Sequence, residues 1–378
     1  MRPPRQELDQ LCEQGLLRQL KPIGGMAGPR ISREGRELWN FSSNDYLGLA
    51  NHPEIKAAFA EGLEKYGAGS AASRLICGTL AAHQILEDSL AQAKQSEAAL
   101  TFSSGFATAM GSIPAIVGKG DHVILDKLSH ACLIDAAKLS EASMRVFAHH
   151  DLGKLEKLLA DIRAKDAKTR ILVACESVYS MDGDLCPLPE IIQLCEQYHA
   201  LLLLDEAHGF GVLGKRGMGL AEELGLQERV TFQMGTLSKA AGLSGGYLAA
   251  SRDWIELLVN RARSFIYSTA PPPAIAHAAC ASLNLILSEQ GQQLRSQLQS
   301  NFRAIRPEAK TPILPVIIGD NEQALESSRQ LEAEGILIPA IRYPTVPRGT
   351  ARLRISLSAI HPQEAIEACQ KALAQLES

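Results

Sequence analysis

One lysine in this chain lies in a setting that favours covalent chemistry on an aldehyde. Lys239 stands in the segment 235–240, just beyond the apolar run 230–234. Its neighbours are small, apolar or hydroxylic, which is unusual for a solvated face. A lysine amine can form an imine with a carbonyl compound. The alternative interpretation is an ordinary surface lysine exposed to water, which is the default for this residue type.

A carboxylate and an imidazole follow a second apolar run. Asp205 and His208 come directly after residues 201–204. Ligands in open α/β sheets bind beyond the carboxyl ends of the strands, where these side chains are expected. Asp205 could keep a pyridinium nitrogen protonated, and His208 could donate to a phenolic oxygen. Together with Lys239 they make pyridoxal 5'-phosphate (PLP) our first hypothesis. The alternatives are a turn aspartate with an exposed histidine or, less favoured without a second His/Cys cluster, a metal site.

A third segment could hold a phosphate group. Residues 103–108 follow a predicted strand and open a predicted helix, with Gly105 at the junction. The free N–H groups and the dipole at the start of a helix attract anions. Thr236 could add a second contact to the phosphate. A serine that merely caps the helix explains the same residues equally well.

Two further polar residues follow predicted strands. His130 could stack on the cofactor ring, although a buried, hydrogen-bonded histidine is the more common case. Ser180 could reach the ring oxygen or a substrate, although an ordinary turn also explains the sequence around it. Residues 67–72 resemble a dinucleotide fingerprint, but no strand precedes them, so we expect a flexible loop on the substrate side.

Two arginines alternate near the end of the chain. Arg352 and Arg354 share one face if residues 352–357 form a strand. One of them could bind a substrate carboxylate through two parallel hydrogen bonds, which a lysine cannot do. The alternative is a pair of solvated charges on an edge strand.

The elements that must position these residues alternate between strand and helix. Short apolar runs occur at 98–102, 122–125, 171–175, 201–204, 230–234 and 247–250. Helical patterns lie between several of them, at about 82–95, 105–117, 152–164 and 188–199. Continuous apolar strands separated by helices indicate a mostly parallel sheet with helices on both faces. The fold class is therefore α/β.

The ends of the chain differ from this pattern. A helix is expected over 7–20 and a strand over 37–41. Beyond about 275 the sequence predicts a long helix over 275–299, strands at 313–318, 336–340 and 352–357, and helices at 323–334 and 362–376. These ranges form a smaller α+β unit. We expect an N-terminal segment over 1–50 that packs with it, a large domain over 51–274 and a small C-terminal domain over 275–378.

The composition is that of an ordinary globular protein. The 378 residues are 46% hydrophobic and 21% charged, and the net charge is −4. The absence of a basic block makes nucleic acid and anionic membranes poor candidate partners. No apolar stretch approaches the roughly 18 residues of a membrane span. The eight cysteines are scattered and form no CxxC pair, which is typical of reduced thiols in the cytoplasm.

Several motifs together resemble the α-oxoamine synthases. They are residues 43–49 (SNDYLGL), 180–183 (SMDG), 205–209 (DEAHG) and the loop from Thr236 to Lys239. The resemblance covers about residues 18–376. It implies a fold-type-I PLP transferase that condenses an amino acid with an acyl thioester and releases CO2. Residues 266–272 and 340–354 resemble one member in particular, which joins L-alanine to a pimeloyl thioester carried by coenzyme A (CoA) or acyl carrier protein.

The resemblance implies a role for each matching residue around the cofactor. Lys239 would carry PLP, Asp205 would bind the ring nitrogen, and His130 would stack on the ring and touch the substrate. Further contacts are implied for the phenolic oxygen by His208 and Ser180, and for the phosphate by Gly105, Phe106 and Thr236.

The resemblance also implies substrate and subunit contacts. Arg354 would hold the amino-acid carboxylate, and Thr345 and Arg18 would contact the acyl substrate. Asn44 and Arg342 are expected on the substrate side as well. Ser268 and Thr269 would reach the cofactor of a neighbouring subunit, which implies a homodimer with shared sites.

Three departures from the family pattern are visible. They are Glu206, where many relatives have aspartate, Tyr343 before Pro344, and Ala71-Ala72 in a turn that is usually richer in glycine. The last two leave the acyl-chain length open. Within the class, the alternative is a member that uses glycine and acetyl-CoA, or another amino acid and thioester. Outside it, the alternatives are a non-catalytic regulatory protein of the same fold and, more distantly, a zinc- or nucleotide-binding protein.

Overall fold

The chain divides into two compact units. The computed structural model describes residues 3–376. The large unit comprises Leu47–Ser180 and Asp184–Ser296. The small unit comprises Met1–Tyr46, Met181–Gly183 and Gln297–Ser378. The division does not fall at residue 275, because the helix that follows this position packs against helices of the large unit.

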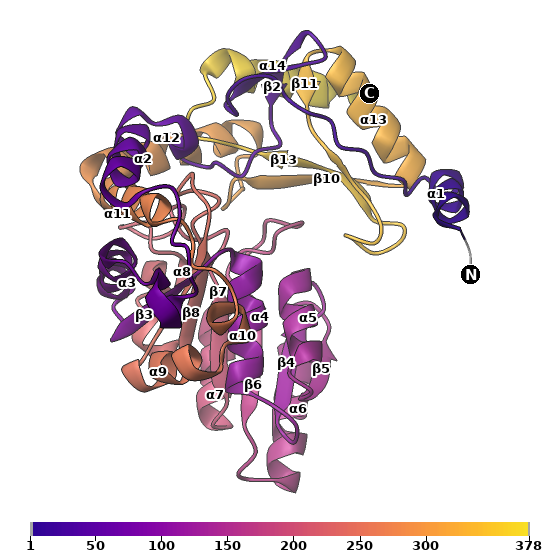
Figure 1. The fold of residues 1–378 in the computed structure, drawn as a ribbon. Helices are drawn as coiled ribbons and strands as arrows, with labels where there is room; N and C mark the ends of the chain where they lie inside the picture. Colours follow the sequence, from indigo (N-terminus) through magenta and orange to yellow (C-terminus); the bar gives the residue numbers. More distant parts are fainter. Residues whose placement is uncertain (1–2, 377–378) are drawn as a thin grey trace. The chain divides into compact units, whose positions relative to one another are not determined.

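A sheet of seven strands forms the centre of the large unit (Figure 1). Strand β9 runs antiparallel to both of its neighbours, and the other pairs are parallel. The mostly parallel sheet expected from the apolar runs is therefore confirmed. In spatial order the strands are β3 (Ala98–Phe102), β9 (Gly246–Ala250), β8 (Phe232–Thr236), β7 (Leu201–Asp205), β6 (Ile171–Glu176), β4 (His122–Asp126) and β5 (Ser143–Phe147).

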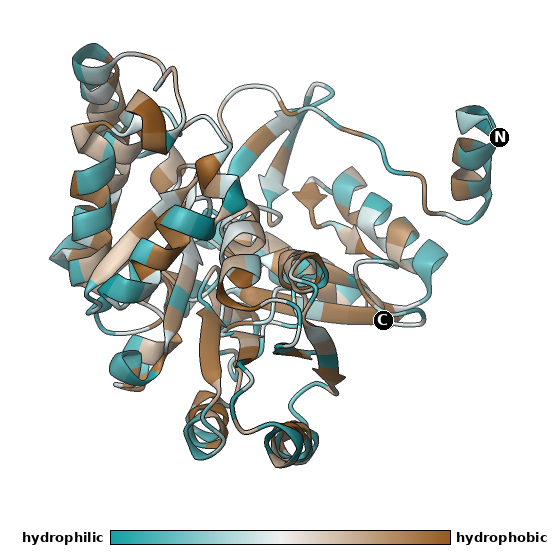
Figure 2. Cartoon of the chain, turned by 60° about the horizontal axis from the view of Figure 1, so that its bottom comes forward, coloured by the Kyte–Doolittle hydropathy of each residue, from teal (hydrophilic) through white to brown (hydrophobic). Residues whose placement is uncertain are grey.

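The inner strands β4, β6 and β7 are largely apolar because both faces of the sheet are buried there, whereas β5 at the edge is mostly exposed. On one face Val123 and Leu125 join a cluster with side chains from α4 (Gly105–Ile116) and α5 (Ala131–Leu139). On the other face Ile124 is also fully buried. Side chains alternate between the faces of a strand, so a strand covered on both sides needs apolar residues at every position. Figure 2 colours the residues by hydropathy and shows brown, hydrophobic stretches on several strands of the chain.

Helices surround this sheet. Polar residues mark some of their starts. The Asp151 side chain accepts from the Lys154 backbone N–H at 2.9 Å and caps α6. Besides α4 and α5, the helices of the large unit are α2 (Pro53–Tyr66), α3 (Ala81–Lys94), α6 (Leu152–Lys165), α7 (Leu188–Gln197), α8 (Leu220–Glu223), α9 (Arg252–Arg261), α10 (Arg263–Ile266) and α11 (Pro273–Leu287), with short turns η1 (Leu49–Asn51), η2 (Arg74–Gly78) and η3 (Gln227–Arg229).

The small unit contains two three-stranded sheets. One has the order β1-β2-β11 and the other β10-β13-β12. Helix α12 (Glu289–Ile305) runs across the division of the chain into its two units. The other elements of the small unit are α1 (Pro4–Glu13), β1 (Arg30–Arg33), β2 (Arg36–Asn40), β10 (Ile313–Gly319), α13 (Asn321–Ala333), β11 (Ile336–Leu337), β12 (Ala340–Ile341), β13 (Ala351–Ser356) and α14 (Gln363–Leu376).

Three of the predicted elements are wrong in extent. The helix expected over 7–20 ends at Glu13, because Gly15 turns the backbone to φ +64°. The helix expected over 275–299 is two helices separated at Ser288, whose extended backbone interrupts the helix and whose hydroxyl accepts from Gly291 N–H at 3.3 Å. The strand expected over 336–340 is two short strands that belong to different sheets. Among residues 3–376, no helix is long and apolar enough to cross a membrane.

Candidate active site

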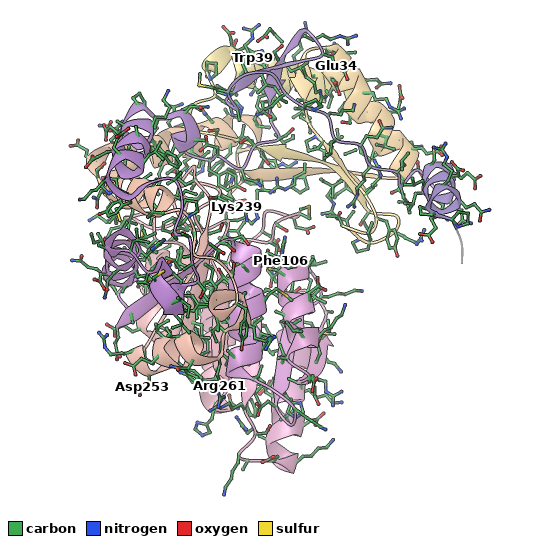
Figure 3. All side chains as sticks on the ribbon, viewed as in Figure 1. Glu34, Trp39, Phe106, Lys239, Asp253 and Arg261 are labelled. Atoms are coloured by element: carbon green, nitrogen blue, oxygen red, sulfur yellow. The ribbon has the colours of Figure 1, made fainter. Side chains whose placement is uncertain are left out.

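A cavity of about 200 Å³ opens at the carboxyl ends of the central strands. Asp205 and Glu176 end neighbouring strands and lie opposite each other in register. Figure 3 labels two of the residues that line the cavity, Lys239 and Phe106. The complete lining is Ser104, Gly105, Phe106, His130, Cys132, Glu176, Asp205, Ala207, His208, Met234, Thr236, Ser238 and Lys239.

Lys239 is carried by the loop between the antiparallel strands β8 and β9. The loop is closed at its base, where Leu237 N–H donates to Gly245 O at 3.0 Å and Thr236 Oγ1 donates to the same oxygen at 2.8 Å. The Lys239 Nζ lies 2.8 Å from His208 Nε2. The structure therefore brings the predicted amine and the predicted imidazole into direct contact.

Asp205 is almost completely buried, with 4% of its surface exposed. One carboxylate oxygen accepts from the Ala207 backbone N–H at 2.9 Å. Burial raises the pKa of Asp205 above its ordinary value, and this effect exceeds the opposing attraction of Lys239. A buried carboxylate of this kind gains from a cationic partner, which is what a protonated ring nitrogen would provide.

Glu176 is a site residue that the sequence interpretation missed. It is buried, and its Oε1 accepts from the His130 backbone N–H at 2.5 Å. Burial, and then the neighbouring Asp205, raise the pKa of Glu176 to about 8. The signal was available, because Glu176 directly follows the predicted strand 171–175 and shares its sheet edge with Asp205. Ser104, Cys132 and Ser238 line the same cavity and were also missed as candidates.

The start of α4 faces the cavity. The Ser104 hydroxyl accepts from Ala107 N–H at 3.0 Å, so the serine does cap the helix as the alternative held. The cap does not compete with phosphate binding, since the backbone N–H groups of Gly105 and Phe106 have no acceptor within the helix. Thr236 Oγ1, within 2.8 Å of the Ser238 hydroxyl, lies at the same cavity.

His130 and Ser180 differ in their position. His130 lines the cavity, and its Nδ1 accepts from Cys132 N–H at 3.2 Å, which caps α5. Ser180 is buried but is not among the lining residues. The roles of both toward a cofactor stay predictions.

The small unit brings the predicted substrate residues together in two groups. Arg354 donates to the Asn44 side chain at 3.2 Å and to the Ser356 hydroxyl at 2.6 Å. Arg18 donates to Thr345 Oγ1 at 3.2 Å. Arg18 and Thr345 belong to the second group, in which Arg342 also donates to the backbone oxygen of Leu17 at 3.0 Å.

The arginines of β13 are not edge charges. Strand β13 lies between β10 and β12, and Arg352 and Arg354 are each 5% exposed. Arg352 donates to Asp182 Oδ1 at 2.5 Å, so its charge is balanced within the small unit. The alternative of a solvated edge strand is therefore wrong.

The two residues expected to reach a neighbouring subunit, Ser268 and Thr269, lie outside the cavity lining, and so does Glu206. Ser268 is half-buried and Thr269 is exposed, with Thr269 paired to Ser73 in an isolated bridge. Their expected contact with a neighbouring subunit stays a prediction. Glu206, the departure from the family pattern, is buried and accepts from Leu220 N–H at 3.1 Å and Ala221 N–H at 3.0 Å, so it fixes α8.

The fold and its lysine loop define the class of protein. A mostly parallel seven-stranded sheet with the lysine after β8 is the architecture of the fold-type-I transferases, which use PLP. The chain belongs to the aminotransferase class I and II family, whose model matches residues 36–373.

Curated relatives narrow the comparison within this family. The 8-amino-7-oxononanoate synthase of Geobacter sulfurreducens is 47% identical over 98% of this chain and 96% of the relative. The enzyme of the same name from Thermoanaerobacter pseudethanolicus is 43% identical over 97% of this chain and 95% of its own length.

Solved structures show the same fold. The serine palmitoyltransferase of Sphingomonas wittichii superposes with a TM-score of 0.91 at 30% identity, covering 99% of this chain and 97% of the other. A structure of SPT with PLP as an internal aldimine gives 0.92 at 29% identity, with the same coverage. The 8-amino-7-oxononanoate synthase of Francisella tularensis gives 0.75 at 28% identity, covering 90% of this chain and 99% of the other.

Proposed function

We propose that this chain is a PLP-dependent enzyme that condenses L-alanine with a pimeloyl thioester, carried by CoA or acyl carrier protein, to form 8-amino-7-oxononanoate in biotin biosynthesis. The observation that carries the proposal is the Lys239 amine, held against His208 at a cavity that also contains the buried Asp205. The identity of 43–47% to the two curated relatives named above supports this substrate choice over that of the serine palmitoyltransferase of Sphingomonas wittichii, which is 30% identical.

The residues of the cavity fit PLP. Lys239 would bind its aldehyde carbon, and the cationic ring nitrogen would satisfy Asp205. The first N–H groups of α4 and the Thr236 hydroxyl would receive the phosphate, His208 and Ser180 would approach the phenolic oxygen, and His130 would cover the ring. When bound, PLP supplies an electron sink for the charge left on the amino-acid Cα.

The chain itself moves protons and orients the reactants. The Lys239 amine would take the Cα proton of alanine as a general base, with His208 at 2.8 Å holding the amine in place. Asp205 would keep a proton on the ring nitrogen. We propose that Arg354, fixed by Asn44 and Ser356, holds the amino-acid carboxylate. The new C–C bond forms at the thioester carbonyl, the thiol leaves, and CO2 is then released.

Replacing Lys239 tests the proposal directly. Lys239→Ala should abolish turnover and the visible absorbance of the bound cofactor, because both depend on the amine. Lys138→Ala, at a lysine with 63% of its side chain exposed, is the matched control and should change neither. Turnover and absorbance that survive in Lys239→Ala would overturn the proposal.

A substrate panel distinguishes the members of the class. The purified holoenzyme would be assayed with alanine, glycine and serine against pimeloyl, acetyl, succinyl and palmitoyl thioesters, with CO2 release as the readout. We expect the highest kcat/KM for alanine with the pimeloyl thioester. A preference for glycine with acetyl-CoA, or for serine with a palmitoyl thioester, would assign the chain to another α-oxoamine synthase while leaving the reaction type intact.

A further inference from the structure

Two adjacent histidines and an aspartate gather in the large unit outside the cavity lining. His149 and His150 lie in the connection between β5 and α6 (Figure 1), and Asp184 lies beyond the end of β6. The Asp184 Oδ2 is 2.8 Å from His149 Nε2 and 3.4 Å from His150 Nε2. One potential ligand atom from each residue lies within 4.8 Å of the other two.

The spacing matches that of ligands around one metal ion. Two ligand atoms at about 2.1 Å from a tetrahedral zinc ion lie roughly 3.4 Å apart. Of the two distances to Asp184, the one to His150 equals this value at 3.4 Å, and the one to His149 is shorter at 2.8 Å. In addition, Asp184 Oδ1 is buried and has no hydrogen-bond partner among residues 3–376, which leaves a carboxylate lone pair unused.

A second carboxylate supports the first histidine. The Asp126 carboxylate oxygens lie 3.0 and 3.1 Å from His149 Nδ1, and Asp126 is 1% exposed. The carboxylate is held in turn by the backbone N–H groups of Leu128 at 2.8 Å and His150 at 3.2 Å. A carboxylate on Nδ1 fixes the imidazole tautomer that presents the Nε2 lone pair to a metal.

From this geometry we propose that His149, His150 and Asp184 bind one divalent transition-metal ion, for which zinc is the best match. Two imidazoles and one carboxylate are a common zinc ligand set, with the fourth position taken by water. Imidazole ligands disfavour magnesium and calcium, which prefer oxygen. In the absence of a metal, a hydrogen bond between His149 Nε2 and Asp184 Oδ2, separate from the contact of Nδ1 with Asp126, takes the place of the ion.

A bound ion would join separate segments of the large unit. It would tie the β5–α6 connection to Asp184, whose backbone oxygen accepts from Tyr179 N–H at 3.0 Å. Tyr179 directly precedes Ser180, so the ion would fix the chain next to a predicted cofactor contact. We therefore expect zinc to raise the unfolding temperature of the holoenzyme, since a ligand that binds only the folded state stabilises it.

Zinc titration of three proteins tests the site. The PLP-loaded enzyme is freed of metal by a chelator and titrated with zinc by calorimetry, beside His150→Asn and His199→Asn. Asparagine suits both positions, because His150 and His199 have φ of 60° and 49°. His199 is exposed and lies outside the cluster, which makes it the matched control. We expect one zinc per chain in wild type and His199→Asn, and at least about tenfold weaker binding in His150→Asn.

The outcomes separate this site from adventitious binding. Equal affinity in all three proteins, or no binding by wild type, would overturn the proposal. Cobalt(II) gives a second readout, since ligation by the exposed thiols of Cys12 or Cys77 would produce a sulfur charge-transfer band and also contradict it. If His150→Asn does not fold, Asp184→Asn carries the same test, with the same loss of affinity expected.

Discussion

At the scale of single residues, the candidate site depends on two acidic side chains that end neighbouring strands. Asp205 and Glu176 lie opposite each other, both are buried, and the pKa of each is raised chiefly by burial. Like charges at this separation cannot both ionise without cost. A cationic ring beside Asp205 would favour the ionised aspartate and leave Glu176 as the protonated partner.

The pH dependence of stability provides a test of Glu176. Its pKa is about 8 in the folded protein and about 4.3 in an unfolded chain. Between these values the unfolded state loses a proton that the folded state keeps, so the free energy of unfolding falls as the pH rises, by up to roughly 1.4 kcal/mol per pH unit. In Glu176→Gln this contribution is absent, and the fall should be shallower. Urea unfolding of the cofactor-free proteins at several pH values measures it; parallel curves for the two proteins would contradict the assignment.

Arg354 should be sensitive to a conservative substitution. Arg354→Lys keeps the positive charge but loses the two parallel donors that match a carboxylate. Arg352 cannot replace it, because it is paired with Asp182. We expect the KM for alanine to rise about tenfold, with a smaller change in kcat, because one charge-assisted hydrogen bond to the carboxylate is lost. Steady-state kinetics measure this, with Arg303→Lys at an exposed position as the control. An unchanged KM would exclude Arg354 as the carboxylate ligand.

The residues found from sequence share one property. Each of them closely follows an apolar strand: Asp205, His208 and Lys239. Ligands in open α/β sheets bind beyond the carboxyl ends of the strands, so these residues were expected at the same edge of the sheet. Glu176 obeys the same rule, but it was counted with its strand rather than with the loop. The contact between Lys239 and His208 depends on how two loops meet in space, and nothing in the local sequence specifies that meeting.

At the scale of elements, strands made of a continuous apolar run were predictable from the sequence, whereas a strand that mixes polar and apolar residues was not. Strand β3 has the expected bounds, because nearly all of it is buried. Strand β5 was missed because it lies at an edge of the sheet and exposes most of its residues. The break at Ser288 was missed for a related reason: the helical pattern continues across it, and only the serine cap marks the start of the second helix.

A glycine in α2 should be required by the packing of two helices. A Cβ added at Gly62 would come within 2.9 Å of Ala274 and His277 in α11. Gly62→Ala should therefore destabilise the protein by about 1–3 kcal/mol, even though alanine favours helix formation. Gly153→Ala in α6 meets nothing closer than 3.7 Å and should be neutral or stabilising. Thermal unfolding of both variants checks this. Equal changes in stability in the two variants would show that helix propensity, rather than packing against α11, determines the effect of an alanine at position 62.

At the scale of the whole molecule, we propose a homodimer in which Ser268 and Thr269 complete the partner's site. Thr269 is exposed and does not line the cavity of its own chain, which supports this role. Light scattering should give twice the mass of the chain.

Complementation tests whether the sites are shared. Lys239→Ala and Thr269→Ala should each be impaired alone. A mixed dimer contains one site with both residues intact if they come from different chains, so co-expression should restore part of the activity. If both residues served the site of their own chain, each site of the mixed dimer would carry one substitution. Co-expression would then restore no activity, and that result would contradict shared sites.

The hairpin that carries Lys239 has a kinetic consequence. Both ends of the loop are hydrogen-bonded across β8 and β9, so the backbone beneath the lysine is fixed, and a displaced amine can move only as far as its four-carbon stem allows. When the amine is displaced it stays tethered, at an effective concentration far above that of any free amine. Small amines in the medium should therefore be poor competitors for the position that Lys239 vacates, and in Lys239→Ala they should restore activity only when supplied in large excess.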